Sequence, residues 1–225
     1  MKNPIRHLLL AATLGVSAPA IAEHHQETHE TSKAANTQTT LNAAADTKTQ
    51  LATASKTEPP ALDSEGKPAV VSSVDLPRYM GKWYEIANFP AFFQKDCAAN
   101  VTADYALTDS GDVTVINACD KADGSRKVAE GLAKSVSDSN AKLKVSFLPK
   151  WLRWLPIGKG DYWVLKLDAD YETVLVGSPD RKYLWILART PSINAQTYSS
   201  YVSAAKAKGF DVSKLVKTKQ TSSGD

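Results

Sequence analysis

Cysteine and histidine are the side chains that could give this chain nucleophilic or metal chemistry, and their positions restrict both. The 225-residue chain holds two cysteines and four histidines, and every histidine comes before residue 30. The region after residue 30 therefore offers no Ser-His or Cys-His pair and no histidine ligand for haem iron. His24, His25 and His29 could hold a metal ion, but a flexible polar tail explains them more simply. We predict no metal site, no cofactor and no enzymatic activity.

Cys97 and Cys119 are expected to form a disulfide. Residues 1–22 are typical of a secretory signal, with a basic start, a short apolar core and small residues before the cleavage point. In an exported chain, an even number of cysteines is usually paired. The bond would close a loop of about 20 residues and contribute roughly 3 kcal/mol in the chain-entropy model.

The composition divides the chain into four parts. Residues 1–22 are the signal, and residues 23–72 form a disordered tether, rich in Ala, Thr, Ser, Gln and Lys and without aromatic residues. Residues 73–220 are the folded domain, and residues 221–225 are a flexible C-terminus. No cysteine follows the cleavage point, so we expect a protein that is periplasmic or secreted, soluble after signal cleavage, and not lipid-anchored. Residues 73–225 carry a net charge of only about +4, which does not indicate nucleic-acid binding.

Short apolar runs separated by turn residues predict eight strands. Many runs alternate apolar and polar residues, as in 101–107, and turn sequences such as Asp109-Ser110-Gly111 separate them. Because no helix intervenes, the pattern predicts an all-β, eight-stranded antiparallel up-and-down barrel, whose interior just holds one small ligand. The expected strands are 83–89, 100–108, 112–118, 127–136, 141–148, 161–168, 173–178 and 183–189.

One C-terminal α-helix is expected to pack on the wall of the barrel. Pro191 ends the last strand, Ser192 or Asn194 can cap the helix, and Gly209 can end it. Residues 212–216 can add a final edge strand. The helix carries one apolar stripe, made of Tyr198, Tyr201, Val202 and Ala205.

The mouth of the barrel is expected to be cationic. Alternate loops of an up-and-down barrel lie at the same end, so the loops 89–100, 119–126, 149–160 and 178–182 should surround the mouth. They carry eight Lys or Arg residues against four Asp residues. Such a rim favours an anionic head on an apolar tail, as in a fatty acid or a lysophospholipid. The predicted headgroup residues are Lys150, Arg153, Lys159 and Arg181, and the predicted tail contacts are Tyr105, Phe147, Trp151, Trp154, Tyr162, Tyr183 and Trp185.

The segment 149–156, with the sequence Pro-Lys-Trp-Leu-Arg-Trp-Leu-Pro, allows two interpretations. Its apolar side chains can fold inward as a lid over the cavity. Alternatively, tryptophans interleaved with cations suit the boundary of a lipid bilayer, so the segment can contact a membrane. The facing of each strand stays open as well, because a register error of one residue inverts it.

Three short motifs resemble the lipocalin family. Gly81-Lys82-Trp83 opens the first strand, Asp170-Tyr171 lies in a turn, and Arg189 closes the last strand. Over about residues 74–220 the chain is most similar to the bacterial outer-membrane lipocalin and apolipoprotein D group. The resemblance implies a cup that carries a hydrophobic molecule, with Trp83 plugging the closed end and Arg189 lying across its ring.

The expected function is therefore binding of a fatty acid or lysophospholipid in the bacterial cell envelope, for carriage or storage. Two alternatives remain. The resemblance allows a thiol-dependent isomerase if the cysteines are free. The chain could also be an envelope interaction module that docks through its tryptophan-rich segment. Glu85 is the one acid expected near the cavity on an early strand, where burial would perturb its pKa.

Overall fold

The computed structural model describes residues 60–155 and 157–221. The predicted signal, residues 23–59 of the predicted tether and residues 222–225 lie outside the described residues, so the predictions for them stay predictions. Within the described ranges, no helix is both long enough and apolar enough to cross a bilayer.

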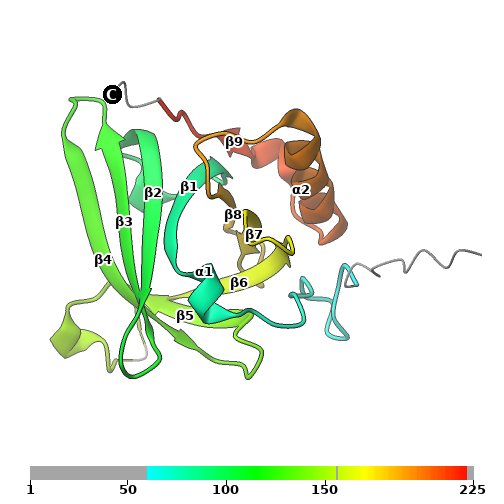
Figure 1. Ribbon diagram of the computed structural model, residues 1–225, viewed down its shortest axis with the longest axis horizontal. Helices are drawn as coiled ribbons and strands as arrows, with labels where there is room; N and C mark the ends of the chain where they lie inside the picture. The colour runs from blue at the N-terminus through cyan, green and yellow to red at the C-terminus, as the bar shows by residue number, and fades with distance from the viewer. Residues whose placement is uncertain (1–59, 156, 222–225) are drawn as a thin grey trace, which may run out of the picture. The chain divides into compact units, whose positions relative to one another are not determined.

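Eight antiparallel strands close into a barrel (Figure 1). Each strand pairs with the next one along the chain, and β1 pairs with both β8 and β2, which closes the ring. The predicted up-and-down barrel is confirmed. Its strands are β1 (Gly81–Asn88), β2 (Cys97–Leu107), β3 (Val113–Lys121), β4 (Arg126–Ser135), β5 (Lys142–Ser146), β6 (Lys159–Leu167), β7 (Thr173–Gly177) and β8 (Leu184–Ala188).

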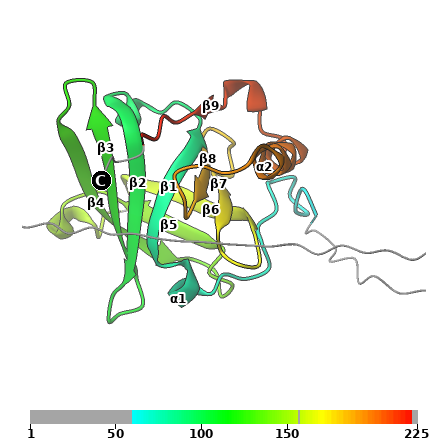
Figure 2. The ribbon, with the colours of Figure 1, turned by 45° about the horizontal axis from the view of Figure 1, so that its top comes forward.

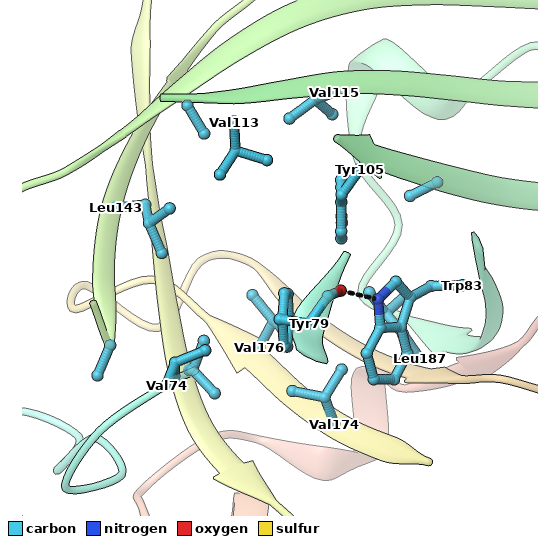
Figure 3. Close-up of a cluster of buried hydrophobic side chains, with 14 residues drawn as sticks. Val74, Tyr79, Trp83, Tyr105, Val113, Val115, Leu143, Val174, Val176 and Leu187 are labelled. Atoms are coloured by element: carbon cyan, nitrogen blue, oxygen red, sulfur yellow. Dashed lines mark hydrogen bonds between the residues drawn. The ribbon is translucent and has the colours of Figure 1, made fainter. Parts of the chain in front are cut away.

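The wall formed by β6, β7 and β8 is covered on both faces, and β7 shows why. All five of its residues are buried. Val174 and Val176 join the cluster inside the barrel (Figure 3), whereas Leu175 belongs to a second cluster on the outside. Alternation along the strand sends neighbouring side chains to opposite faces, so a strand that is apolar at every position needs cover on both sides.

The outer cover is the predicted helix, α2 (Ala195–Ala207), which lies beside this wall (Figures 1 and 2). The Asn194 side chain caps it by accepting a hydrogen bond from the Thr197 N–H at 2.8 Å. Gly209 follows the helix with a φ of +83°, the left-handed conformation that ends many helices. Of the predicted stripe, Tyr201 and Ala205 are fully buried and Tyr198 and Val202 are partly buried against the same cluster.

Packing against the barrel includes residues that precede the predicted domain boundary at residue 73. Residues 60–72, assigned above to the tether, pack against the barrel: the Val71 N–H donates to the Val164 carbonyl at 3.0 Å, and Ala69 is buried. The apolar run Ala69-Val70-Val71 explains the difference, because averaging over a polar 50-residue stretch conceals it. This segment leads into a short helix that the sequence analysis missed, α1 (Leu76–Tyr79), which lies at one end of the barrel (Figure 1).

The C-terminal segment seals a seam at the other end. β1 pairs with β2 only through residues 81–84, and beyond that point β9 (Val216–Lys217) pairs with β1. The Gln220 amide then donates to the carbonyls of Glu85 and Val101 at 2.8 and 2.9 Å, which bridges the two strands. The expected edge strand therefore exists, but at 216–217, after a 3-10 turn at Val212–Lys214.

Candidate functional site

Trp83 and Arg189 close one end of the barrel. The indole is fully buried, and the Arg189 guanidinium lies 3.8 Å from its ring centroid. The same guanidinium donates to the carbonyls of Lys82 and Arg78, each at 2.9 Å, while the indole N–H donates to the Tyr79 carbonyl at 2.9 Å (dashed in Figure 3). A cation against an aromatic face and an N–H on a carbonyl together fix both sides of the plug.

The turn 168–173 beside the plug is held by Asp168, which lies outside the Asp170-Tyr171 motif. Tyr171 has a φ of +63°, and its hydroxyl accepts a hydrogen bond from the Asp75 N–H at 2.9 Å. Asp170 is exposed. Asp168 instead orders the turn, because its carboxylate accepts from the N–H groups of Asp170, Glu172 and Thr173. Its place at the end of the predicted strand 161–168, where the turn sequence Asp168-Ala169-Asp170 begins, was the available signal.

Above this plug lies a cavity of about 740 Å³. Its walls are mainly aliphatic, from Val113, Val115, Leu143, Val164 and Leu187. A volume of this size is typical of sites for small organic ligands. Of the seven predicted tail contacts, five line the cavity, namely Tyr105, Phe147, Tyr162, Tyr183 and Trp185.

The floor of the cavity carries three tyrosines, which we call the floor tyrosines: Tyr79, Tyr105 and Tyr162. The Tyr162 hydroxyl lies 2.6 Å from that of Tyr79 and 3.3 Å from that of Tyr105. The Tyr79 and Tyr105 rings are stacked with centroids 5.9 Å apart. Burial raises the pKa of all three phenols well above its ordinary value, so they remain protonated at neutral pH.

Aromatic side chains also surround the mouth. Tyr183 and Trp185 are stacked with centroids 5.9 Å apart, and the Phe93 ring lies 5.7 Å from that of Tyr183. Phe93 belongs to the turn η1 (Phe92–Gln94), and its neighbour Phe92 is 77% exposed while lining the opening. The sequence analysis missed these two phenylalanines, although their adjacency in a predicted mouth loop was a usable signal.

Glu85 is a buried acid in the cavity wall, as expected. Its carboxylate accepts hydrogen bonds from the Thr218 hydroxyl at 2.6 Å and from the Gln94 amide at 2.7 Å. Burial raises the pKa of Glu85, and these two hydrogen bonds oppose the rise. The Gln94 amide oxygen in turn accepts from the Trp185 indole at 3.2 Å. The acid therefore ties the C-terminal segment to the aromatic mouth.

The structure spreads the four predicted headgroup residues over different surfaces. Lys159 lines the cavity. Arg181 turns away, donating to the carbonyls of Lys208 and Gly66 at 2.9 and 2.7 Å. Lys150 and Arg153 lie on the outer wall. A cation that was not singled out, Lys127, lines the cavity and pairs with Asp96 at 3.1 Å.

Ion pairs neutralise much of the rest of the rim. Arg126 pairs with Asp120 at 2.7 Å, Lys121 with Asp123 at 3.2 Å, and Lys182 with Asp180 at 3.1 Å. The sequence count already set these acids against the rim cations, so the pairs leave its net charge unchanged. The positive charge at the opening is smaller than predicted because Lys150, Arg153 and Arg181 lie elsewhere.

The tryptophan-rich segment is not a lid. Trp151 and Trp154 are 73% and 77% exposed, and neither lines the cavity. The segment folds back along the outer face of β4 to meet the turn at 108–112. The lid interpretation is therefore wrong for these two residues, and they are not tail contacts in this structure. The loop 147–158 between β5 and β6 has twelve residues, which is long enough to leave the mouth, and its composition does not reveal this course.

Cys97 and Cys119 form the predicted disulfide, joining β2 to β3 at the mouth end. The thiol-dependent isomerase needs a free thiol, which this bond removes. Across residues 60–155 and 157–221, no group of three or more His, Cys, Asp or Glu side chains is arranged to hold a metal ion. The polar side chains that line the cavity can hydrogen-bond to a ligand, and its lysines can attract an anionic group.

Sequence comparison finds one family and several relatives. A family model described as a lipocalin-like domain matches residues 74–220. Temperature-induced lipocalin-1 of Arabidopsis thaliana is 43% identical over 155 residues, which are 68% of this chain and 82% of that protein. The outer membrane lipoprotein Blc of Citrobacter freundii is 41% identical, over 67% of this chain and 82% of its own length. Apolipoprotein D of Mus musculus is 30% identical, over 70% and 83%.

Solved structures share the fold at lower identity. Insecticyanin from the tobacco hornworm Manduca sexta superposes with a TM-score of 0.55 at 21% identity, covering 72% of this chain and 88% of that one. Lobster apocrustacyanin A1 gives a TM-score of 0.53 at 17% identity, covering 66% and 81%. Both likenesses concern the fold alone.

Proposed function

This chain belongs to the lipocalin family, and on that basis we propose that it binds a single-tailed lipid, a fatty acid or a lysophospholipid, and carries or stores it in the cell envelope. Binding of a small hydrophobic molecule is the general activity that the family and the relatives support. The observation that carries the finer proposal is an aliphatic cavity whose mouth is lined by two lysines, Lys127 and Lys159.

The two lysines suit an anionic head for different reasons. Lys159 is exposed at the start of β6, so its ammonium group can reach a ligand head without leaving a buried partner. Lys127 also donates to the Phe93 carbonyl at 3.1 Å, which places its charge beside the aromatic mouth. A carboxylate or phosphate there keeps its hydration while the tail is buried, which avoids the cost of taking a charge into an apolar interior.

Calorimetric titration with hexadecanoic acid tests this placement. Reversing the charge, in Lys127→Glu and Lys159→Glu, should each weaken binding by about 3–10-fold, the effect of one partly exposed ion pair. Lys150→Glu, on the outer wall, is the matched control and should leave the affinity unchanged. Equal affinity in all three variants would place the head elsewhere, and no binding by the wild type would refute lipid carriage.

A second candidate is contact of the protein with a membrane surface. Trp151 and Trp154 are exposed beside Lys150 and Arg153, and Ile157 is 66% exposed in the same loop. Exposed tryptophan next to cations is typical of side chains that lie at the headgroup level of a bilayer. In this arrangement the lipid would be loaded or released at the membrane.

Vesicle flotation separates the two candidates. The double variant Trp151→Ser with Trp154→Ser should lose binding to vesicles of phosphatidylglycerol and phosphatidylcholine, yet still bind hexadecanoic acid. Val128→Ser, which removes an exposed apolar side chain from the wall of β4, is the control. Vesicle binding that is unchanged in the double variant would exclude docking through this segment.

A location in the cell envelope follows from the predicted signal, which precedes the described residues. The relatives named outer membrane lipoprotein raise the question of an anchor. The intact mass of the protein purified from cells that express the full chain answers it. We expect an N-terminus at Glu23 without added acyl mass; an acylated chain, or one that keeps residues 1–22, would overturn this proposal.

A further inference from the structure

The floor tyrosines place three hydroxyl groups at the deep end of the cavity, beside walls that are mainly aliphatic. They come from three separate elements: Tyr79 from α1, Tyr105 from β2 and Tyr162 from β6. All three line the cavity, and Tyr162 is the central hydroxyl of the group. A floor of phenylalanine would close the barrel equally well, so packing alone does not account for three hydroxyls that converge here.

The floor tyrosines have at least one hydroxyl proton that they do not use among themselves. Three phenols carry three O–H protons, while the two O···O contacts can use at most two of them. Within residues 60–155 and 157–221, these oxygens make no further hydrogen bond. At least one proton is therefore available to an acceptor that enters the cavity. Because the three phenols stay protonated at neutral pH, this donor is permanent.

The acceptor that suits this floor is neutral. Arg189, the cation of the closed end, is already engaged with the Trp83 ring and with backbone carbonyls. An ionised carboxylate at this depth would lose its hydration and meet phenols alone, whereas Lys127 and Lys159 lie at the mouth. A hydroxyl or carbonyl group loses far less hydration, and one hydrogen bond from a phenol compensates for much of that loss.

We propose that the preferred ligand is polar at both ends: an ω-oxygenated fatty acid, with its carboxylate at the mouth and a hydroxyl or carbonyl at the tail end against the floor tyrosines. This inference rests on the proposed function and narrows its ligand class. It makes the three floor hydroxyls together the determinant of specificity, because any of them can carry the available proton.

Titration calorimetry with matched pairs of acids tests the inference. Decanoic, dodecanoic and hexadecanoic acid are each compared with their ω-hydroxy derivatives, so that one chain length spans the cavity. At that length the hydroxy acid should bind the wild type about 3–10-fold more tightly, the effect of one hydrogen bond. In the triple variant Tyr79→Phe with Tyr105→Phe and Tyr162→Phe, which removes all three floor hydroxyls, the preference should fall to less than about 2-fold. Tyr183→Phe, at the mouth, should retain it.

The possible outcomes separate the inference about the floor from the proposal of lipid carriage. If the plain acids bind and no chain length shows a preference, the inference is wrong and lipid carriage stands. If the preference survives in the triple variant, the floor is not the contact. If the triple variant does not fold, as judged by its circular dichroism, a crystal structure of the wild type with the ω-hydroxy acid carries the test: the ω-oxygen should lie within hydrogen-bonding distance of a floor hydroxyl, and an ω-oxygen elsewhere would overturn the inference. If no acid binds the wild type, lipid carriage fails and the inference with it.

Discussion

Arg189 holds the closed end of the barrel through several contacts at once. Its guanidinium covers the Trp83 ring and donates to the carbonyls of Lys82, Arg78 and Tyr171. Gly81 is required by the backbone rather than by space: its φ is +91°, which favours glycine, whereas a Cβ there would lie at an ordinary contact distance of 3.5 Å from Arg189 Nη1. The three motif positions therefore serve one structural purpose, which is to seal the floor of the cavity.

Removing this side chain should destabilise the fold strongly. Arg189→Ala loses the cation–π contact and leaves three carbonyls without their donor, so we expect the free energy of unfolding to fall by about 2–4 kcal/mol. Urea denaturation measures it. Lys182→Ala, which removes an exposed ion pair, should cost less than about 1 kcal/mol. Equal losses in the two variants would contradict the role given to Arg189.

Glu85 should make stability depend on pH. Its pKa in the folded protein is raised above the ordinary 4.5, chiefly by burial. The folded state then holds the proton to a higher pH than the unfolded state, so burial of the ionised form costs stability. The free energy of unfolding should fall as the pH rises from 4.5 through the raised pKa, and level off above it.

The variant Glu85→Gln isolates this effect. Its free energy of unfolding, measured by urea denaturation across that pH window, should lack the decline that the wild type shows. Asp211→Asn is a control of opposite sign, because hydrogen bonds from Ser213 lower the pKa of Asp211 and make its contribution grow with rising pH. A wild type and a Glu85→Gln variant with parallel profiles would contradict a raised pKa at Glu85.

At the scale of elements, the strands were predictable and their surroundings were not. Period-2 patterning and turn residues located all eight strands to within a few residues, and the spacing of Tyr198, Tyr201 and Ala205 located the helix. The course of the loop after β5 was not predictable, since tryptophan next to lysine suits a lid and an outer wall equally. Whether a rim cation is paired depends on which acid lies across the turn, and this is a tertiary property.

The mouth depends on a close approach of β4 and β5. A Cβ on Gly131 would lie 2.9 Å from the Phe147 ring and 3.1 Å from the Ser146 carbonyl. Gly131→Ala should therefore displace the Phe147 ring and lower the free energy of unfolding by about 1–3 kcal/mol, measured by thermal unfolding. At Gly160 the nearest atom, Val145 Cγ1, would lie at 3.6 Å. Gly160→Ala is thus the control, and an equal loss there would show that the Phe147 contact is not the cause.

For the whole molecule, the plug and the cationic mouth lie at opposite ends of the cavity. The plug of Trp83 and Arg189 makes the barrel a cup, and the disulfide, the C-terminal segment and the aromatic turn η1 shape its opening. The family motifs report the closed end, so they identify the fold without identifying the ligand. The ligand must be inferred from the cavity wall, the two mouth lysines and the floor tyrosines.

Native mass spectrometry of the protein purified from the cell envelope tests the central claim, that the cavity binds a single-tailed lipid. We predict an added mass, released on denaturation, that corresponds to one fatty acid or lysophospholipid per chain. The double variant Lys127→Glu with Lys159→Glu should carry markedly less of it. A wild type that carries no such mass, and that takes none up from added hexadecanoic acid, would contradict the claim.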